Sequence, residues 1–338
     1  MAKNKKFPHM DLSPNCKDCY IQNMARICIV LATYNGEKYL SEMLDSLVAQ
    51  SRPADAIIAV DDGSNDSTCE ILKKYKGTLP IQIEALPQNT GHRAAFSYAL
   101  TLAQKIITKD DLIALADQDD VWLPQKLEIL EKTLESTKTS LVFGDAEVID
   151  GNGNIIAGSW RDFSKIEKHV SIEHQIAGIN NVTGCMSLFE ASLLDAVLPI
   201  PEGVTVHDRW IAIIADKNDG IATTDMPVIQ YRIHGGNAVG GVASQSMRKT
   251  IEERISWIET LLAHKERLGL TETEILFAKE LSELSRARLQ KSLMPSKLPW
   301  IFKHRKELFL KDSPFKTMKR VLFSAIGYPL ARKLFGKS

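Results

Sequence analysis

Asp117, Asp119 and Asp120 form a dense group of acids directly after the apolar segment 112–116. A hard divalent cation such as Mg²⁺ or Mn²⁺ prefers carboxylate oxygens, and one or two carboxylates commonly hold it together with substrate phosphates. Such an ion would neutralise a diphosphate as it leaves. The same acids would also suit a solvated turn, or a cap for a helix that begins at Pro124. The group alone therefore leaves a metal site and a capped turn open.

A second acidic turn, Asp61-Asp62-Gly63-Ser64, follows the apolar segment 56–60. Its carboxylates can accept hydrogen bonds from a pyrimidine N–H or from ribose hydroxyls. Gly63 lets the chain turn sharply. The alternative interpretation is an ordinary Asp-Gly turn in which Ser64 caps the next helix.

Short apolar segments alternate with segments of helical periodicity in the first half of the chain. The predicted strands are 26–32, 56–60, 81–85 and 112–116, and the predicted helices are 39–50, 67–76 and 91–107. This alternation predicts a parallel sheet with helices on both faces. Ligands on such a sheet bind outside the carboxyl ends of the strands. Both acidic groups, and Thr33-Tyr34-Asn35, lie at that edge, so their shared position favours a binding site over unrelated turns.

Past Ser140 the alternation ends. Strands are predicted at 141–150, 181–190 and 226–233, with a helix at 207–215. This part should form an antiparallel extension that carries the acceptor side of a cleft, and one or two helices should cover 247–290. The predicted organisation is an N-terminal tail (1–25), a catalytic domain (26–240) and a helical, basic C-terminal region (241–338).

The composition narrows the class of protein. Lys+Arg and Asp+Glu both total 42, and no recognition module is evident, so nucleic-acid binding is not predicted. Five cysteines without a secretory leader predict reducing, cytoplasmic surroundings. Cys16 and Cys19 form an isolated Cys-x-x-Cys pair that lacks the further ligands of a zinc site. The chain has no stretch of 18 apolar residues, so no membrane span is predicted.

Several motifs resemble those of the inverting, GT-A-fold glycosyltransferases of family 2. The first are Ala32-Thr33-Tyr34-Asn35, Asp61-Asp62-Gly63-Ser64, Asn89-x-Gly91 and Asp117-Gln118-Asp119-Asp120. Later motifs resemble the bacterial rhamnosyltransferase-like branch that builds surface polysaccharides: Thr183-Gly184-Cys185, His207-Asp208-Arg209-Trp210 and Tyr231-Arg232-x-His234-Gly235-Gly236-Asn237. The resemblance implies an α/β fold, with a Rossmann-like nucleotide-binding half of mostly parallel sheet and an antiparallel acceptor-side extension.

The resemblance also implies a donor site in which Tyr34 and Asp61 embrace the nucleobase. Asp117 would contact the ribose and Asp119 would hold Mg²⁺ or Mn²⁺. His234 would approach that metal or the diphosphate, although a single histidine is more often structural. The implied donor-binding residues are Ala32, Tyr34, Glu37, Asp61, Asp62, Arg93, Asp117, Gln118 and Gly184. A turn or bulge is the alternative role for the last of these.

By the same resemblance, Asp208 is the general base. An inverting transfer needs a carboxylate that takes the proton of the acceptor hydroxyl as its oxygen attacks the anomeric carbon. Capping of the helix that begins near 207 is the alternative role. The wider family has a glutamate before this aspartate, whereas this chain has His207, which would orient the base or touch the sugar. Trp122 and Trp210 complete the predicted acceptor side.

Between Lys297 and Lys337, basic residues recur among aromatic ones, with few acids. This interleaving suits an anionic membrane surface, and a helical cap with a basic exposed face is the alternative. Peripheral contact would place the protein at the inner face of the cell membrane, where a polyprenyl-diphosphate-linked acceptor stays.

These features predict a metal-dependent, inverting sugar transfer in O-antigen- or capsule-type polysaccharide synthesis. The favoured donor is dTDP-rhamnose, and the acceptor is a glycan or a polyprenyl-diphosphate-linked sugar. A UDP-hexose donor with the same mechanism is the nearest alternative, and a non-catalytic nucleotide-sugar binding protein is another. A nucleotidyltransferase is disfavoured because no glycine-rich, lysine-bearing triphosphate loop lies near the first strand. A homodimer stays open.

Overall fold

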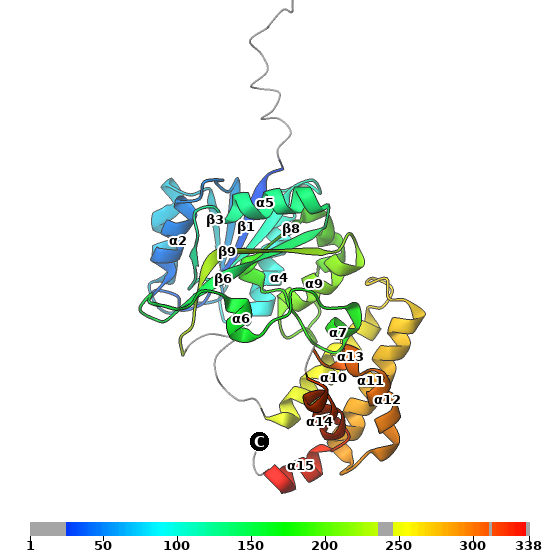
Figure 1. Cartoon of the computed structure of the whole chain (residues 1–338). Coiled ribbons are helices and arrows are strands. Elements are labelled where there is room, and N and C mark those ends of the chain that lie inside the picture. Colours follow the sequence, from blue (N-terminus) through cyan, green and yellow to red (C-terminus); the bar gives the residue numbers. More distant parts are fainter. Residues whose placement is uncertain (1–24, 236–245, 311–312, 336–338) are drawn as a thin grey trace, which may run out of the picture.

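The computed structural model describes residues 25–235, 246–310 and 313–335 (Figure 1). Cys16 and Cys19, the domain boundary predicted at 240 and the Gly236-Asn237 end of the last motif lie outside the described residues. In the described part, nine strands form one sheet in the order β3-β2-β1-β4-β8-β6-β9-β5, with β7 paired to β6.

The first half of the chain forms the parallel part of the sheet. β1 pairs in parallel with β2 and β4, and β2 pairs in parallel with β3. Side chains of β1 alternate between two cores, with Val30 in one and Ile29 and Leu31 in the other. A strand buried on both faces is apolar throughout, which is why the sequence pattern reveals it. The bounds are β1 (Ile27–Thr33), β2 (Ala56–Asp61), β3 (Ile81–Ala85) and β4 (Leu112–Ala116).

Different helices cover the two faces of the sheet, as predicted. Buried side chains of α2 (Leu40–Val48), α3 (Thr68–Lys74) and α5 (Lys126–Thr137) share one core. Buried side chains of α4 (His92–Ala103) and α9 (His207–Lys217) share the other (Figure 1). The helices therefore pack on both faces of the sheet and leave the carboxyl ends of the parallel strands accessible to a ligand.

The second half extends the same sheet in mixed orientation. β8 (Ser187–Glu190) runs antiparallel to β4 and to β6 (Leu141–Ile149), as predicted. β9 (Ile221–Arg232) instead runs parallel to β6. The connection through α9 brings the chain back to the end of the sheet at which β6 begins, so both strands run in the same direction. Two short strands were not predicted from the sequence: β5 (Val121–Trp122), which pairs antiparallel with β9, and β7 (Ile155–Ala157).

Further helices follow in the C-terminal region. Among the described residues, no helix is long and apolar enough to span a bilayer. Trp257 and Phe277 belong to the same core as α4 and α9, so these helices continue the core of the catalytic half. Their bounds are α10 (Met247–Ala263), α11 (Glu272–Gln290), α12 (Leu298–Lys303), α13 (Arg305–Leu308), α14 (Pro314–Ser324) and α15 (Tyr328–Phe335) (Figure 1).

Candidate active site

A cavity of about 750 Å³ opens at the carboxyl ends of β1 and β4. Its walls come from the loops after these strands, from residues 178–184 and from the first turn of α9. The predicted site residues that line it are Ala32, Tyr34, Asp62, Asp117, Gln118, Asp119, Gly184, His207 and Asp208. Chain segments as far apart as Ala32 and Asp208 therefore meet where the parallel sheet was expected to bind its ligand.

The Tyr34 loop is held by Gln118. The side chain of Gln118 accepts a hydrogen bond from the Tyr34 backbone N–H (2.8 Å) and donates one to the Tyr34 carbonyl (3.0 Å). A Cβ atom on Gly36 would collide with Gln118 Oε1, so a larger residue there would displace the Gln118 amide from these two hydrogen bonds. Tyr34 itself is 42% exposed, so its ring is available for stacking.

The carboxylates of Asp61 and Asp62 each accept three hydrogen bonds from the protein. Asp61 accepts hydrogen bonds from Thr33 Oγ1 (2.9 Å) and from the backbone N–H and Oγ of Ser64 (2.9 and 2.6 Å). Asp62 accepts from the backbone N–H and Oγ1 of Thr90 (2.8 and 2.7 Å) and from the Gly91 N–H (2.8 Å). These bonds tie the loops of β1 and α4 to the end of β2. Asp62 still lines the cavity, whereas Asp61 lies behind it.

Other predicted site residues also lie away from the cavity wall. Glu37 accepts a hydrogen bond from the Ser67 N–H, and Arg93 donates one to the Ile200 carbonyl. Trp122 and Trp210 are 2% and 0% exposed and fill the two cores on opposite faces of the sheet. We therefore leave both tryptophans out of the proposed acceptor side.

The end of β9 is bonded to the acidic loop. The Arg232 backbone N–H donates to Asp120 Oδ1 (2.9 Å), and its Nε donates to the Asp119 carbonyl (2.8 Å). Two residues later, His234 Nε2 lies 2.8 Å from Asp119 Oδ2. A predicted metal ligand and the predicted histidine, 115 residues apart, are thus in direct contact.

The acidic loop fits a divalent cation. Asp117 and Asp119 line the cavity, and the imidazole of His234 adds a nitrogen ligand beside them. A second group, Asp117, Asp120 and Cys185, has its ligand atoms within 4.8 Å of one another. Burial raises the pKa of the Cys185 thiol well above its usual value, and a protonated thiol is a poor ligand for a hard cation. The oxygen and imidazole ligands at the cavity therefore fit Mg²⁺ or Mn²⁺ better.

Beneath this loop lies a buried cluster of charge. Burial, and then the charge of Asp119, raises the pKa of Asp117 to about 7 and moves that of Asp120 in the same direction. Asp120 Oδ2 is buried and has no hydrogen-bond partner among the described residues. The ammonium group of Lys126, fully buried, lies over the Trp122 ring, and burial lowers its pKa to about 7. A bound cation would favour the ionised carboxylates.

Asp208 lies in the first turn of α9 and faces the cavity. The Gly184 N–H donates to its Oδ2 (3.2 Å) and Asn180 Nδ2 donates to its Oδ1 (3.3 Å). A Cβ atom on Gly184 would lie 3.4 Å from Asp208 Cβ and 3.1 Å from His207 Nε2, so this approach requires a small residue. Burial raises the pKa of Asp208 to about 6. The carboxyl is then ionised at pH 7 but more basic than an exposed aspartate, which suits a general base.

His207 is buried beside this aspartate. Its ring stacks on Phe96, with 3.9 Å between ring centroids, and lies edge-on to His92 at 6.2 Å. Burial, and then the charge of His92, lowers the pKa of His207 to about 3, so the ring is neutral at pH 7. Its Nδ1 is buried without a partner among the described residues. A neutral histidine adds no positive charge that would weaken Asp208 as a base.

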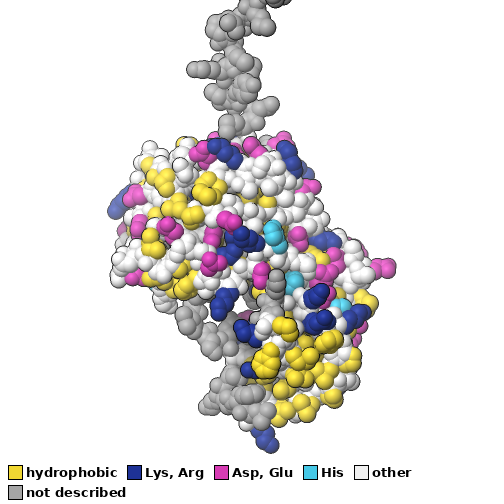
Figure 2. Space-filling model, in the orientation of Figure 1, with side chains coloured by type: hydrophobic (Ala, Val, Ile, Leu, Met, Phe, Trp, Pro, Cys, Tyr) yellow, Lys and Arg dark blue, Asp and Glu magenta, His cyan; other side chains and the backbone are white. Residues whose placement is uncertain are grey.

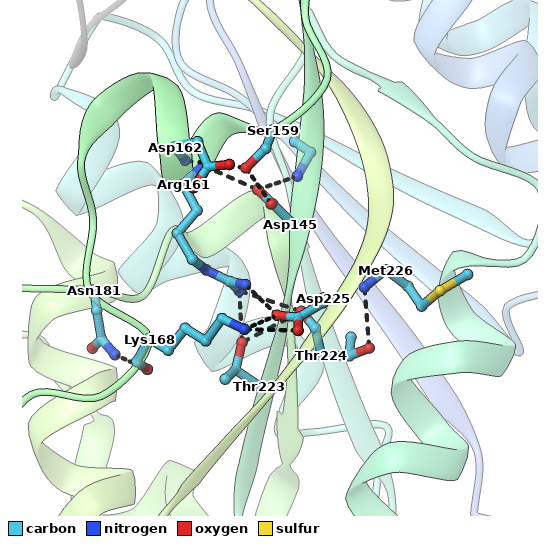
Figure 3. A network of polar contacts seen from close by, with 11 residues as sticks. Asp145, Ser159, Arg161, Asp162, Lys168, Asn181, Thr223, Thr224, Asp225 and Met226 are labelled. Carbon is cyan, nitrogen blue, oxygen red and sulfur yellow. Dashed lines mark hydrogen bonds and ion pairs between the residues drawn. The ribbon is translucent and has the colours of Figure 1, made fainter.

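A polar network joins β6, β9 and the residues that follow β7 (Figure 3). Asp145 on β6 accepts hydrogen bonds from Ser159 Oγ (2.6 Å) and the Arg161 N–H (3.0 Å). The Arg161 side chain in turn bonds to Asp225 (2.8 Å) on β9. These contacts hold α6 (Trp160–Ser164) against the sheet and set Trp160 at the cavity.

Sequence reasoning missed several cavity residues. The ring of Trp160 lies 4.5 Å from that of Tyr231, and both line the cavity together with His92, Phe96 and Asn180. Tyr231 lies in a motif noted above, but its side chain was given no role. A tryptophan directly after the helix-capping Ser159 is a weak signal, because most tryptophans simply pack.

The family assignment follows from comparison of this chain with known proteins. The profile described as glycosyl transferase family 2 matches residues 28–198, half of the chain. The chain belongs to glycosyl transferase family 2. The predicted GT-A family resemblance is thereby confirmed.

Three relatives illustrate the range of similarity. An uncharacterized glycosyltransferase of Nostoc sp. is 30% identical over 223 residues, covering 63% of this chain and 66% of that protein, so this chain spans just under two thirds of that relative. A dTDP-rhamnosyl transferase of Shigella flexneri is 25% identical, covering 62% of this chain and 73% of that protein. A UDP-Glc:α-D-GlcNAc-diphosphoundecaprenol β-1,3-glucosyltransferase of Escherichia coli is 24% identical, covering 61% and 77%.

Two solved structures share the fold. Staphylococcus aureus TarS 1–349 in complex with UDP-GlcNAc superposes with a TM-score of 0.57 at 16% identity, over 89% of this chain and 81% of that one. A mannosyltransferase of Pyrobaculum calidifontis in complex with GDP-Man and Mn²⁺ gives a TM-score of 0.52 at 18% identity, over 94% and 89%. The predicted α/β architecture of GT-A type is confirmed.

Proposed function

We propose that this protein is a metal-dependent, inverting glycosyltransferase that moves a sugar from a nucleotide-sugar donor to a hydroxyl acceptor. The observation that carries the proposal is one cavity lined by both Asp119, in contact with His234, and Asp208, a half-buried carboxyl of raised pKa. A protein that only bound the donor would not need a carboxyl of raised pKa at this position. Family membership and the nucleotide-sugar complexes of the structural neighbours support the same class.

Each part of the cavity has a proposed role. Tyr34, with Ala32 and Asp62 nearby, would hold the nucleoside, and Asp117 would contact the ribose. Asp119 and His234 would hold Mg²⁺ or Mn²⁺, which when bound would neutralise the departing diphosphate. Asp208 would take the proton of the acceptor hydroxyl, because inversion requires one base at the attacking oxygen.

The favoured donor is dTDP-rhamnose, and the favoured pathway is surface polysaccharide synthesis. The motifs around Gly184, Asp208 and His234 support this, as does the similarity to the Shigella rhamnosyl transferase. A UDP-hexose donor is the second candidate, supported by the Escherichia coli relative, whose name specifies UDP-glucose and a diphosphoundecaprenol-linked acceptor. A lipid-linked acceptor of this kind would keep the enzyme at the cytoplasmic face of the cell membrane.

A donor screen tests the proposal. The protein is incubated with Mg²⁺ or Mn²⁺ and with dTDP-rhamnose or UDP-hexoses, and release of the nucleoside diphosphate is followed. We expect release from dTDP-rhamnose that is lost in Asp119→Ala and retained in the exposed control Asp195→Asn. Release from UDP-sugars alone would keep the mechanism and discard rhamnose.

Thermal shifts with the same donors provide a second measurement, because a ligand that binds only the folded state raises its melting temperature. If the protein bound donors but hydrolysed and transferred none of them, even with a lipid-linked acceptor, a non-catalytic binding protein would replace the proposal.

A further inference from the structure

One surface of the C-terminal region exposes apolar side chains that an isolated soluble domain would be expected to bury. Phe315, Met318 and Leu322 on α14 are 81%, 46% and 54% exposed. Figure 2 shows hydrophobic side chains gathered over the C-terminal helices on this side of the molecule. Large exposed apolar patches on soluble proteins commonly mark an interaction site.

The three side chains share one face of α14, called here the α14 face. Their spacing of three and then four residues places them within one side of an α-helix. Val321, 3% exposed, points from the same helix into the core, so α14 is anchored with its apolar face outward. Ser313 caps the first turn, and the Met294 N–H donates to the Ala325 carbonyl at the end of the helix. The exposure of the α14 face is therefore built into the fold.

Positive charge lies along one side of the α14 face. Between Ser313 and Phe335 the chain carries no Asp or Glu, and its cations are Lys316, Lys319, Arg320, Arg332 and Lys333. At 100° per residue, Lys319 follows directly beside the apolar side chains, and Lys316 and Arg320 lie further round on the same side of the helix. An exposed apolar strip flanked by Lys and Arg is the pattern of a helix that lies in the plane of an anionic bilayer surface.

We propose that the α14 face docks on an anionic lipid membrane, with Phe315, Met318 and Leu322 in the interfacial layer. The charge distribution argues against a second copy of the chain as the occupant. An isologous dimer through this face would bring the same cations of both copies together, and opposed like charges weaken an interface. An anionic lipid surface complements both the apolar strip and its flanks.

The structure also limits which part of the basic, aromatic tail is available for membrane contact. Trp300 packs against Phe277 and donates from Nε1 to Glu280 (2.7 Å), so this aromatic side chain stabilises the helical cap. The membrane contact and the cap are therefore divided between α14 and α12. The two interpretations of the tail, membrane contact and a helical cap, thus apply to different helices of the same region.

The docking surface is linked to the candidate active site. α10, α11 and α13 all contact α7 (Ile172–Ile176), which leads directly into the cavity wall at 178–184. Docking through α14 would hold the cavity at a fixed distance from lipid, as a lipid-linked acceptor needs. Only this benefit rests on the proposed function, because membrane binding itself requires no sugar donor.

Vesicle co-sedimentation of the full chain, without donor or acceptor, tests the inference. We expect binding to vesicles of phosphatidylcholine with phosphatidylglycerol, little binding to phosphatidylcholine alone, and weakening by salt. Phe315→Ser with Leu322→Ser should weaken binding by about tenfold or more, because both side chains leave the apolar layer. Lys319→Glu should weaken binding by about tenfold while keeping the apolar strip.

Matched control variants distinguish specific binding through the α14 face from nonspecific adsorption to vesicles. Ile155→Ser with Leu276→Ser removes two side chains that are 58% and 57% exposed elsewhere, and Lys74→Glu reverses an exposed charge on α3. Melting curves confirm that each variant is folded. Binding that is absent, equal for both vesicle types, or lost in the controls but not in the α14 variants would overturn the inference.

Sedimentation equilibrium tests whether a second copy of the chain occupies the α14 face instead. A dimer that dissociates in the Phe315→Ser, Leu322→Ser variant would show that it does, and would also overturn the inference. Nucleoside diphosphate release is measured separately in the same variants. Loss of vesicle binding with unchanged release would leave both the membrane inference and the proposed function standing. Vesicle binding by the unaltered chain, when that chain releases no nucleoside diphosphate from any donor, would keep the membrane inference and remove only the proposed function.

Discussion

Two groups of aspartates lie at the same edge of the sheet, and they differ in hydrogen bonding and in pKa. Asp61 and Asp62, at the end of β2, each accept three hydrogen bonds from neighbouring loops. Asp117 and Asp120, after β4, have raised pKa values, and one oxygen of Asp120 has no partner among the described residues. Asp208 shares this behaviour, with a pKa raised to about 6 by burial.

The difference separates structure from chemistry. A carboxylate that accepts three hydrogen bonds from the protein stabilises the loops that bond to it, and about one acceptor position is left for a ligand. A buried carboxyl of raised pKa costs folding energy in its ionised form and is retained where a metal or a proton uses it. We therefore expect aspartates in neighbouring motifs to have different roles, the first group mainly structural and the second mainly chemical, and the following predictions test that division.

The largest expected effect is on catalysis at Asp208. Asp208→Asn should lower the rate of transfer by at least about 100-fold, because the acceptor hydroxyl loses its base. Donor affinity, measured by thermal shift, should stay unchanged. Since the neutral amide avoids a buried charge, stability at pH 8 should not fall and should rise by up to about 3 kcal/mol. Transfer at the wild-type rate would remove Asp208 from the chemical side of the comparison.

Substitution of Asp62 should affect stability more than catalysis. Asp62→Ala leaves the Thr90 and Gly91 N–H groups and the Thr90 hydroxyl without their acceptor, which should lower the free energy of unfolding by about 3 kcal/mol. Chemical denaturation measures this effect, with the exposed Asp195→Asn as the control. A loss below about 1 kcal/mol would mean that the hydrogen bonds of Asp62 do not stabilise the fold as proposed.

The pH dependence follows from the raised pKa of Asp208, about 6. A general base acts in its ionised form, so kcat/KM should fall about tenfold per pH unit below pH 6. The folded state holds this proton more tightly than the unfolded chain, so the contribution of Asp208 to stability should increase as pH falls from 7 towards 4. Activity and this contribution should thus move in opposite directions. An activity profile flat down to pH 5, with donor still bound, would contradict the assignment.

The smallest expected effect concerns Asp61. Thr33→Val keeps the side-chain shape and removes one of the three hydrogen bonds that Asp61 accepts, so stability should fall by about 1 kcal/mol. Donor hydrolysis should be nearly unchanged, because Thr33, although at the cavity wall, is only 2% exposed and its hydroxyl is bonded to Asp61, which lies behind that wall. The matched control is Thr101→Val on α4, where the hydroxyl bonds only to its own helix. A large loss of hydrolysis in Thr33→Val would move Asp61 to the chemical side.

Much of the fold could be predicted because its signals are local. β1, β2 and β4 are buried on both faces and so appear as short apolar runs in the sequence. The acidic turns directly follow these runs, and their position at one edge of the sheet depends only on the strands being parallel. The direction of β9 could not be predicted in the same way, because it depends on the path of the crossover through α9.

The sequence by itself determined which residue types stand at the carboxyl ends of the strands, and hence the place of the cavity. Only the tertiary structure decided which side chains face it. Trp210 follows Asp208 by two residues, and on a helix this turns its side chain by about 200°, into the core. His234 reaches Asp119 only because β9 is bonded to the acidic loop. Local patterns depend on neighbours in the chain, whereas the direction of a side chain depends on packing between elements that lie far apart in it.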